Sequence, residues 1–247
     1  MLIILIIIMV KLELFVNSII DNKRILFPLV FWYNFRKWGV IMDFEKMLAF
    51  VKKTLEENNA IKPLKAHHSF RSRYTHSVRI YKWCKRLVLD LPNCNKDILY
   101  TAAIFHDIGY AHGKKDHAKE SAKLFLEYAK DNNFDDDFSS EVARIISLHS
   151  NKELLKDKDS TDELILLLEA DLLDEEGCMG IVWDLLSKGA LGCENYEDSL
   201  SEVWNHSGHI LNQDYMVTPI AKKYWDEKKN FVKEFLEQFE SDLFLED

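Results

Sequence analysis

The chain has 247 residues, of which 47% are hydrophobic, and it carries a formal net charge of −9 with only eight glycines and four prolines. This composition favours one all-α domain with a large core, because a strand-rich fold would need more turn residues. The negative charge argues against broad attraction to nucleic acids or anionic membranes. The four cysteines form no CxxC pair, so the sequence indicates neither a zinc ribbon nor a disulfide framework, and ordinary thiols in a reducing cytoplasm are expected.

Residues 1–41 differ from the rest of the chain. The run Met1 to Val10 is aliphatic, but it is too short to cross a bilayer and it lacks the features of a signal peptide. Three interpretations remain open: an extension from a misassigned start codon with Met42 as the true start, a segment packed on the domain, or a membrane or partner anchor. We therefore divide the chain into an N-terminal apolar extension, 1–41, and a domain over 42–247.

After Met42, apolar residues recur at helical spacing. The pattern predicts nine helices, at about 43–58, 72–91, 96–107, 117–131, 138–149, 161–174, 178–188, 195–212 and 219–242. Capping signals precede several of them: Asn95, Asp116, and Ser160 with Glu163. The aromatic stripe of the last helix predicts packing on the domain, or else the face of a homodimer.

In five of these segments, a histidine or aspartate lies on the apolar face of the helix or is the last residue of its apolar stripe. A buried carboxylate such as Asp171 would lose several kcal/mol of hydration unless a cation met it. We therefore predict a metal site, with one or two ions. Its candidate ligands are His76, His106, Asp107, His117, His149 and Asp171. Imidazoles and carboxylates without thiolates suit divalent Fe, Mn, Zn, Co, Ni or Mg, and the sequence does not rank these.

Two further details of the ligand set can be read from the sequence. The adjacency of His106 and Asp107 indicates a helix end, because neighbouring helical residues point about 100° apart. His112 is an alternative to His117 as the third histidine, but it lies in a glycine-flanked loop without an apolar stripe.

A phosphorylated substrate would need cationic contacts near such a site. Arg79 lies one helical turn after His76 and is the first candidate; its alternative partner is the carboxylate of Asp174. Arg73 and the loop residues Lys114 and Lys115 are further candidates, with a solvated loop as the other interpretation of the two lysines. No GxSxG or P-loop motif supplies a nucleophile or a phosphate cradle.

Five stretches of the chain resemble the HD-domain metal-dependent phosphohydrolases. They are RYTHSVRIYKW, AAIFHDIGY, DHAKESAKLF, IISLHS and LLEADLLDEEGCMGI, and they span about residues 70–185. The resemblance implies a helical HD bundle, here with additional C-terminal helices. It also implies a minimal metal set of His76, His106, Asp107 and Asp171, extended to two ions by His117 and His149 with Asp107 as a bridge.

The resemblance implies hydrolysis of a nucleotide or other small phosphate ester by metal-activated water, with Asp107 and Arg79 as catalytic residues. The chain lacks the GYP element and carries Tyr110 where cyclic-dinucleotide phosphodiesterases often have lysine; it also lacks the HDxxED pattern of alarmone hydrolases. Two alternatives remain: a di-iron oxygenase similar to myo-inositol oxygenase, which shares the ligand order, and a non-catalytic nucleotide-sensing module.

Overall fold

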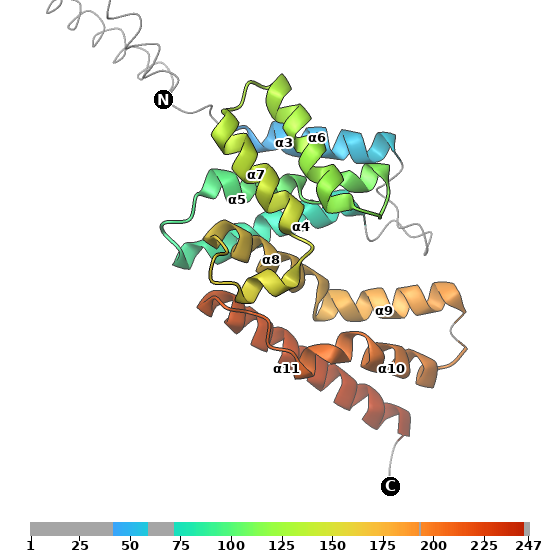
Figure 1. Ribbon diagram of the computed structural model, residues 1–247. Coiled ribbons are helices and arrows are strands. Elements are labelled where there is room, and N and C mark those ends of the chain that lie inside the picture. Colours follow the sequence, from blue (N-terminus) through green and yellow to red (C-terminus); the bar gives the residue numbers. More distant parts are fainter. Residues whose placement is uncertain (1–41, 59–71, 193, 245–247) are drawn as a thin grey trace, which may run out of the picture. The chain divides into compact units, whose positions relative to one another are not determined.

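The computed structural model describes residues 42–58, 72–192 and 194–244, and these are helical with no strand among them (Figure 1). The α-helices are α3 (Phe44–Glu57), α4 (Arg73–Leu87), α5 (Lys96–Phe105), α6 (His117–Asp131), α7 (Asp136–Leu148), α8 (Asp162–Glu175), α9 (Cys178–Leu191), α10 (Tyr196–Asn205) and α11 (Pro219–Phe244). Short 3-10 helices are η2 (Val88–Asp90), η3 (Ile108–His112), η4 (Lys152–Lys156) and η5 (Ser207–Asn212). The predicted all-α class is confirmed.

The helix boundaries agree with the sequence periodicity except where local capping differs. The segment predicted as one helix over 195–212 is divided at His206 into α10 and η5. Asp116 precedes α6 but makes no capping bond, and its φ of 56° is left-handed. The N-cap of α8 is Thr161 rather than Ser160, because the Thr161 hydroxyl accepts the Leu164 N–H. Asn95 caps α5 as predicted.

Helix α5 lies at the centre of the bundle and contacts α3, α4, α6, α7 and α8. Five of its apolar residues are fully buried, as expected of a helix in the middle of a bundle: Leu99, Ala102, Ala103, Ile104 and Phe105. The helix ends at Phe105, so the chain turns at His106 and Asp107 inside the bundle. This turn places two polar side chains where a longer apolar helix would have placed packing residues.

A buried carboxylate attaches the C-terminal helices to the bundle. Glu169 of α8 is fully buried, and its oxygens accept the N–H groups of Val217 and Thr218 and the Thr218 hydroxyl. These donors lie at the start of α11, where a helix carries unpaired N–H groups and a partial positive charge. Helices α9, α10 and α11 pack together on this side of the bundle (Figure 1).

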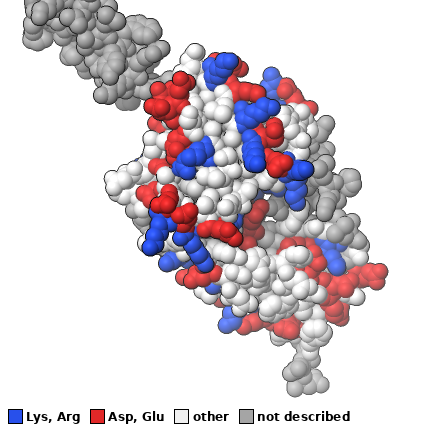
Figure 2. Space-filling model, viewed as in Figure 1, with Lys and Arg blue, Asp and Glu red and all other residues white. Residues whose placement is uncertain are grey.

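Residues Asp43–Asp247 cluster as one compact unit. The expectation for the extension 1–41 lies outside the described residues, and within those residues no helix has the length and apolarity needed to cross a membrane. On the face shown in Figure 2, acidic and basic side chains are interspersed. The apolar stripe of α11 is divided: Leu236 is buried, whereas Phe231 and Phe244 are 45% and 54% exposed, so the homodimer face stays a prediction.

We predict that Gly109→Ala destabilises the fold, because a Cβ at this position would collide with the His117 carbonyl oxygen and lie 2.6 Å from the Ser121 nitrogen. Overpacking of this kind costs about 1–3 kcal/mol, and each kcal/mol lowers Tm by about 2–4 °C in a chain of this size. The control is Gly189→Ala in α9, where the added Cβ meets nothing within 4 Å. Thermal unfolding should show a lower Tm for the first variant only; equal Tm values would contradict the packing of η3 on α6.

Candidate metal centre

All six predicted ligands converge on the inner end of α5. His106 and Asp107 follow α5 directly, and His149 follows α7 in the same way. The others are His76 in α4, His117 at the start of α6 and Asp171 in α8. The side chains of His76, His106, Asp107 and His149 are between 0% and 3% exposed, so ionisable groups occupy the interior of the bundle.

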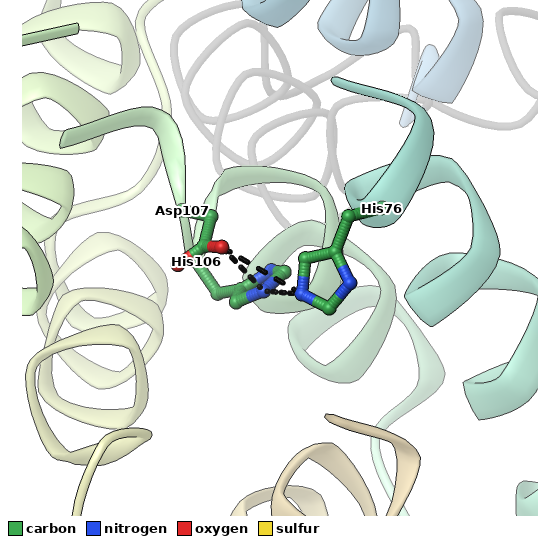
Figure 3. Close-up of side chains that lie close together, drawn as sticks. All are labelled: His76, His106 and Asp107. Atoms are coloured by element: carbon green, nitrogen blue, oxygen red, sulfur yellow. Dashed lines mark hydrogen bonds and ion pairs between the residues drawn. The ribbon is translucent and has the colours of Figure 1, made fainter. Parts of the chain in front are cut away.

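A first set of ligand atoms faces one oxygen of Asp107. The Nε2 atoms of His76 and His106 lie 3.2 Å apart, and each lies 3.6 Å from Asp107 Oδ2 (Figure 3). Asp171 Oδ1 lies 3.1 Å from His76 Nε2 and adds a second carboxylate on that side. Ligands about 2.1 Å from one ion at angles of 90–109° are about 3.0–3.4 Å apart, which is close to these spacings.

A second set faces the other oxygen of the same carboxylate. His117 Nε2 and His149 Nε2 lie 3.5 Å and 3.4 Å from Asp107 Oδ1. His76, His106 and Asp107, and likewise Asp107, His117 and His149, therefore form two groups whose ligand atoms lie within 4.8 Å of one another. Asp107 belongs to both groups through different oxygens, so it would contribute one oxygen to each group if both held an ion.

The far nitrogen of each histidine is held by an acceptor, which turns Nε2 inward. His106 Nδ1 lies 2.9 Å from the Ala103 carbonyl, and His149 Nδ1 lies 2.7 Å from the Ile146 carbonyl. His117 uses its Nδ1 in the same way on the Lys114 carbonyl, at 3.2 Å. A carbonyl can only accept, so Nδ1 carries the proton and the Nε2 lone pair of the neutral ring points into the site.

The electrostatic environment keeps two of these rings neutral. Burial, together with the neighbouring His149 and His76, lowers the pKa of His106 to about 4. Burial also lowers the pKa of His117. Although burial opposes its charge, the carboxyl of Asp107 has a pKa well below its ordinary value because the imidazoles and Arg73 stabilise the anion. Lone pairs of neutral rings and of a carboxylate thus converge, and a cation is the group that such an arrangement binds.

His76 differs from the other three histidines because carboxylates flank both of its nitrogens. Its Nδ1 lies 2.8 Å from Asp174 Oδ2, and Arg79 donates to both oxygens of Asp174 at 2.7 and 2.8 Å. Burial lowers the pKa of His76, but the hydrogen bonds to Asp171 and Asp174 outweigh it and raise the value to about 9. Arg79 therefore reaches the site through Asp174, which is the alternative that the sequence left open.

The other predicted cationic residues separate into two kinds. Arg73 donates to Asp107 Oδ2 at 2.9 Å, and its guanidinium lies 3.9 Å from the centre of the Tyr110 ring. Lys114 and Lys115 are exposed in the loop between η3 and α6. The alternative third histidine, His112, is exposed and lies 3.3 Å from Glu120 Oε2, so the structure brings His117 rather than His112 to the site.

Two further polar residues reach the ligands without having been identified in the sequence. Lys152, the first residue of η4, donates to Asp171 Oδ2 at 2.5 Å. Ser150 Oγ lies 3.2 Å from His117 Nε2. Both come within three residues of His149, in the segment HSNK, and that proximity was the only signal available because η4 has no long apolar stripe.

Comparisons with known proteins agree with this geometry. The HD domain family model matches residues 73–176. An HD-superfamily hydrolase from Bacillus thuringiensis superposes with a TM-score of 0.60 at 22% identity, over 81% of this chain and 96% of that chain. YpgQ from Bacillus subtilis, solved in complex with ADP, gives 0.58 at 18% identity over 81% and 94%. No curated protein matches the sequence.

A third structure, an HD-superfamily hydrolase from an uncultured Thermotogales bacterium, gives a TM-score of 0.55 at 19% identity over 81% of this chain and 92% of that chain. At these identities the likeness concerns the fold. The family match covers all six candidate ligands, from His76 to Asp171, and the matched helices bring those ligands together. Residues 73–176 of this chain thus form an HD domain.

Proposed function

We propose that the protein is a metal-dependent phosphohydrolase that acts on a nucleotide or another small phosphate ester. The observation that carries the proposal is the pair of ligand groups sharing Asp107, with imidazole lone pairs and carboxylate oxygens directed at two adjacent positions. When bound there, divalent ions supply an activated water and polarise a phosphoryl oxygen, so no side-chain nucleophile is required.

The side chains around the ligand groups then have distinct roles. Asp107 would supply one oxygen to each position, and Asp171 would complete the first. Arg73 binds substrate phosphate, because its side chain is 24% exposed and its guanidinium is oriented by both Asp107 and the Tyr110 ring. We now assign Arg79 to positioning, since its two hydrogen bonds to Asp174 hold the carboxylate that orients His76.

A nucleotide is the substrate class that one structural relative favours, since YpgQ from Bacillus subtilis was solved with ADP. The observations on this chain itself support the phosphate part of such a substrate, through Arg73. Similarity of fold thus supports a nucleotide as the substrate, whereas the residues of this chain support a phosphate ester of any kind.

The shared Asp107 also favours a second candidate, a di-iron oxygenase, because two ions bridged by one carboxylate serve that chemistry equally well. The metal content and the reaction distinguish the two. Bound iron with oxygen uptake and no phosphate release would favour the oxygenase. Nucleotide binding without turnover of any phosphate ester would instead favour a sensing module. A screen of phosphate esters on protein of known metal content tests all three.

We predict that Asp107→Ala abolishes metal binding, that His106→Ala removes the ion of the first group, and that both abolish phosphate release while the helical fold persists. Each removes an inward-facing ligand atom, and Asp107 serves both positions. Metal content by elemental analysis and helicity by circular dichroism should be measured on the same samples. The control is His206→Ala, whose ring is 61% exposed and pairs with Glu202. Wild-type metal content in both site variants would refute the ligand assignment.

A second prediction concerns the number of ions. His117→Ala and His149→Ala should lower the stoichiometry from about two ions per chain to about one, because His76, His106 and Asp171 still surround the first position. Equilibrium dialysis followed by elemental analysis measures the ratio. A wild-type protein that binds one ion, with the same ratio in both variants, would restrict the site to the first group.

A third prediction follows from the pKa of His76, which is raised from 6.5 to about 9 in the metal-free protein. A raised pKa stabilises the metal-free fold below pH 6.5, and this contribution is lost as the pH rises toward 9. Metal binding at pH 7.5 must displace that proton, so we expect release of about one proton per first ion. Calorimetric titration with Mn²⁺ in buffers of different ionisation enthalpy measures it; buffer-independent heats would contradict the protonation of His76.

A further inference from the structure

Lys152 occupies an unusual place beside the candidate metal centre. Its ammonium lies 2.5 Å from Asp171 Oδ2 and 3.2 Å from the His149 carbonyl. The other oxygen of Asp171, Oδ1, faces His76 Nε2 at 3.1 Å. One carboxylate is thus shared between the first ligand group and a lysine, and Lys152 is close enough to reach a molecule bound at that position.

Arg73 and Lys152 resemble each other in placement. Each forms an ion pair with a carboxylate of the first group, Arg73 with Asp107 and Lys152 with Asp171. Their side chains are 24% and 28% exposed, whereas that of His76 is 2% exposed. Each of the two cations thus joins a carboxylate of the buried group while keeping part of its side chain in contact with solvent.

The charges of the first group point to the kind of ligand that it completes. The carboxylates of Asp107 and Asp171 are already paired with Arg73 and Lys152, and Asp174 is paired with Arg79. Divalent ions added to these paired charges leave an excess of positive charge in a largely buried site, where excess charge is costly. A phosphate dianion, or the doubly charged terminal phosphate of an ester, carries the compensating charge.

We propose that Lys152 is a substrate-binding residue whose ammonium contacts a non-bridging phosphoryl oxygen of the bound phosphate ester. The inference rests on the proposed function and names a residue that the sequence did not single out. Asp171 holds the ammonium in place before the substrate arrives. Three N–H donors are available on Lys152, two directed at Asp171 and the His149 carbonyl, so a third can be directed at the substrate.

A purely structural role for Lys152 makes a different prediction about metal binding. If the lysine only oriented Asp171, its removal would loosen a ligand and weaken metal binding. If it is an anion contact, it competes electrostatically with the metal for the same carboxylate. Its removal should then leave metal binding unchanged or tighter and weaken phosphate binding.

The experiment compares the full chain with Lys152→Met and with Lys156→Met, which removes an exposed lysine from the same 3-10 helix, η4. Mn²⁺ binding to the metal-free proteins is measured by calorimetry. Binding of inorganic phosphate to the Mn²⁺-loaded proteins is measured by equilibrium dialysis. Lys152→Gln replaces Lys152→Met if circular dichroism shows that the methionine variant is unfolded.

We expect Lys152→Met to raise the Kd for phosphate at least about tenfold, as for loss of a charge-assisted hydrogen bond, with a Kd for Mn²⁺ no higher than in the wild type. Lys156→Met should match the wild type in both. Unchanged phosphate binding in Lys152→Met, weaker Mn²⁺ binding in that variant, or no phosphate binding by the Mn²⁺-loaded wild type would each overturn this inference alone. A wild type that binds no Mn²⁺ would overturn the proposed function as well.

Discussion

Asp107 is almost fully buried, and the imidazoles around it are each turned inward by a hydrogen bond on the far nitrogen. Burying a carboxylate among rings that present lone pairs is unfavourable unless protons or cations lie between them. Two helices, α5 and α7, end at the site, so their last-turn carbonyls can hold the histidine rings with Nε2 directed at Asp107. His106 and His149 stand one residue beyond α5 and α7, and each ring donates from Nδ1 to a carbonyl in the last turn of its own helix.

Three cationic side chains, Arg73, Arg79 and Lys152, surround these ligands and form ion pairs with different carboxylates. Arg79 is tied to Asp174 through two hydrogen bonds and acts on His76 from behind. Arg73 and Lys152 are tied to the carboxylates that face the ligand group itself. Two ions held by histidine and aspartate serve either hydrolysis or oxygen chemistry. The two partly exposed cations beside these carboxylates favour an anionic substrate and therefore the hydrolase.

Most of the helices and all six candidate ligands could be predicted from local patterns in the sequence. Apart from the division of 195–212 into α10 and η5, the 3.6-residue period of apolar residues located α3 to α11 to within a few residues, because a helix on the surface of one core must bury one face. The same period showed that His76, His149 and Asp171 lie on buried faces, where only a partner could offset their desolvation. The adjacency of His106 and Asp107 indicated the helix end at which both residues now lie.

Partner choice depended on tertiary structure, because ion pairs join residues far apart in the chain. Arg79 pairs with Asp174 across 95 positions and Lys152 with Asp171 across 19, and no helical period relates either pair. The division of Asp107 between two ligand groups likewise needs the packing of α6 and α7 against α5. The sequence by itself determined which side chains are buried and polar; only the packing of helices decided which of them face one another.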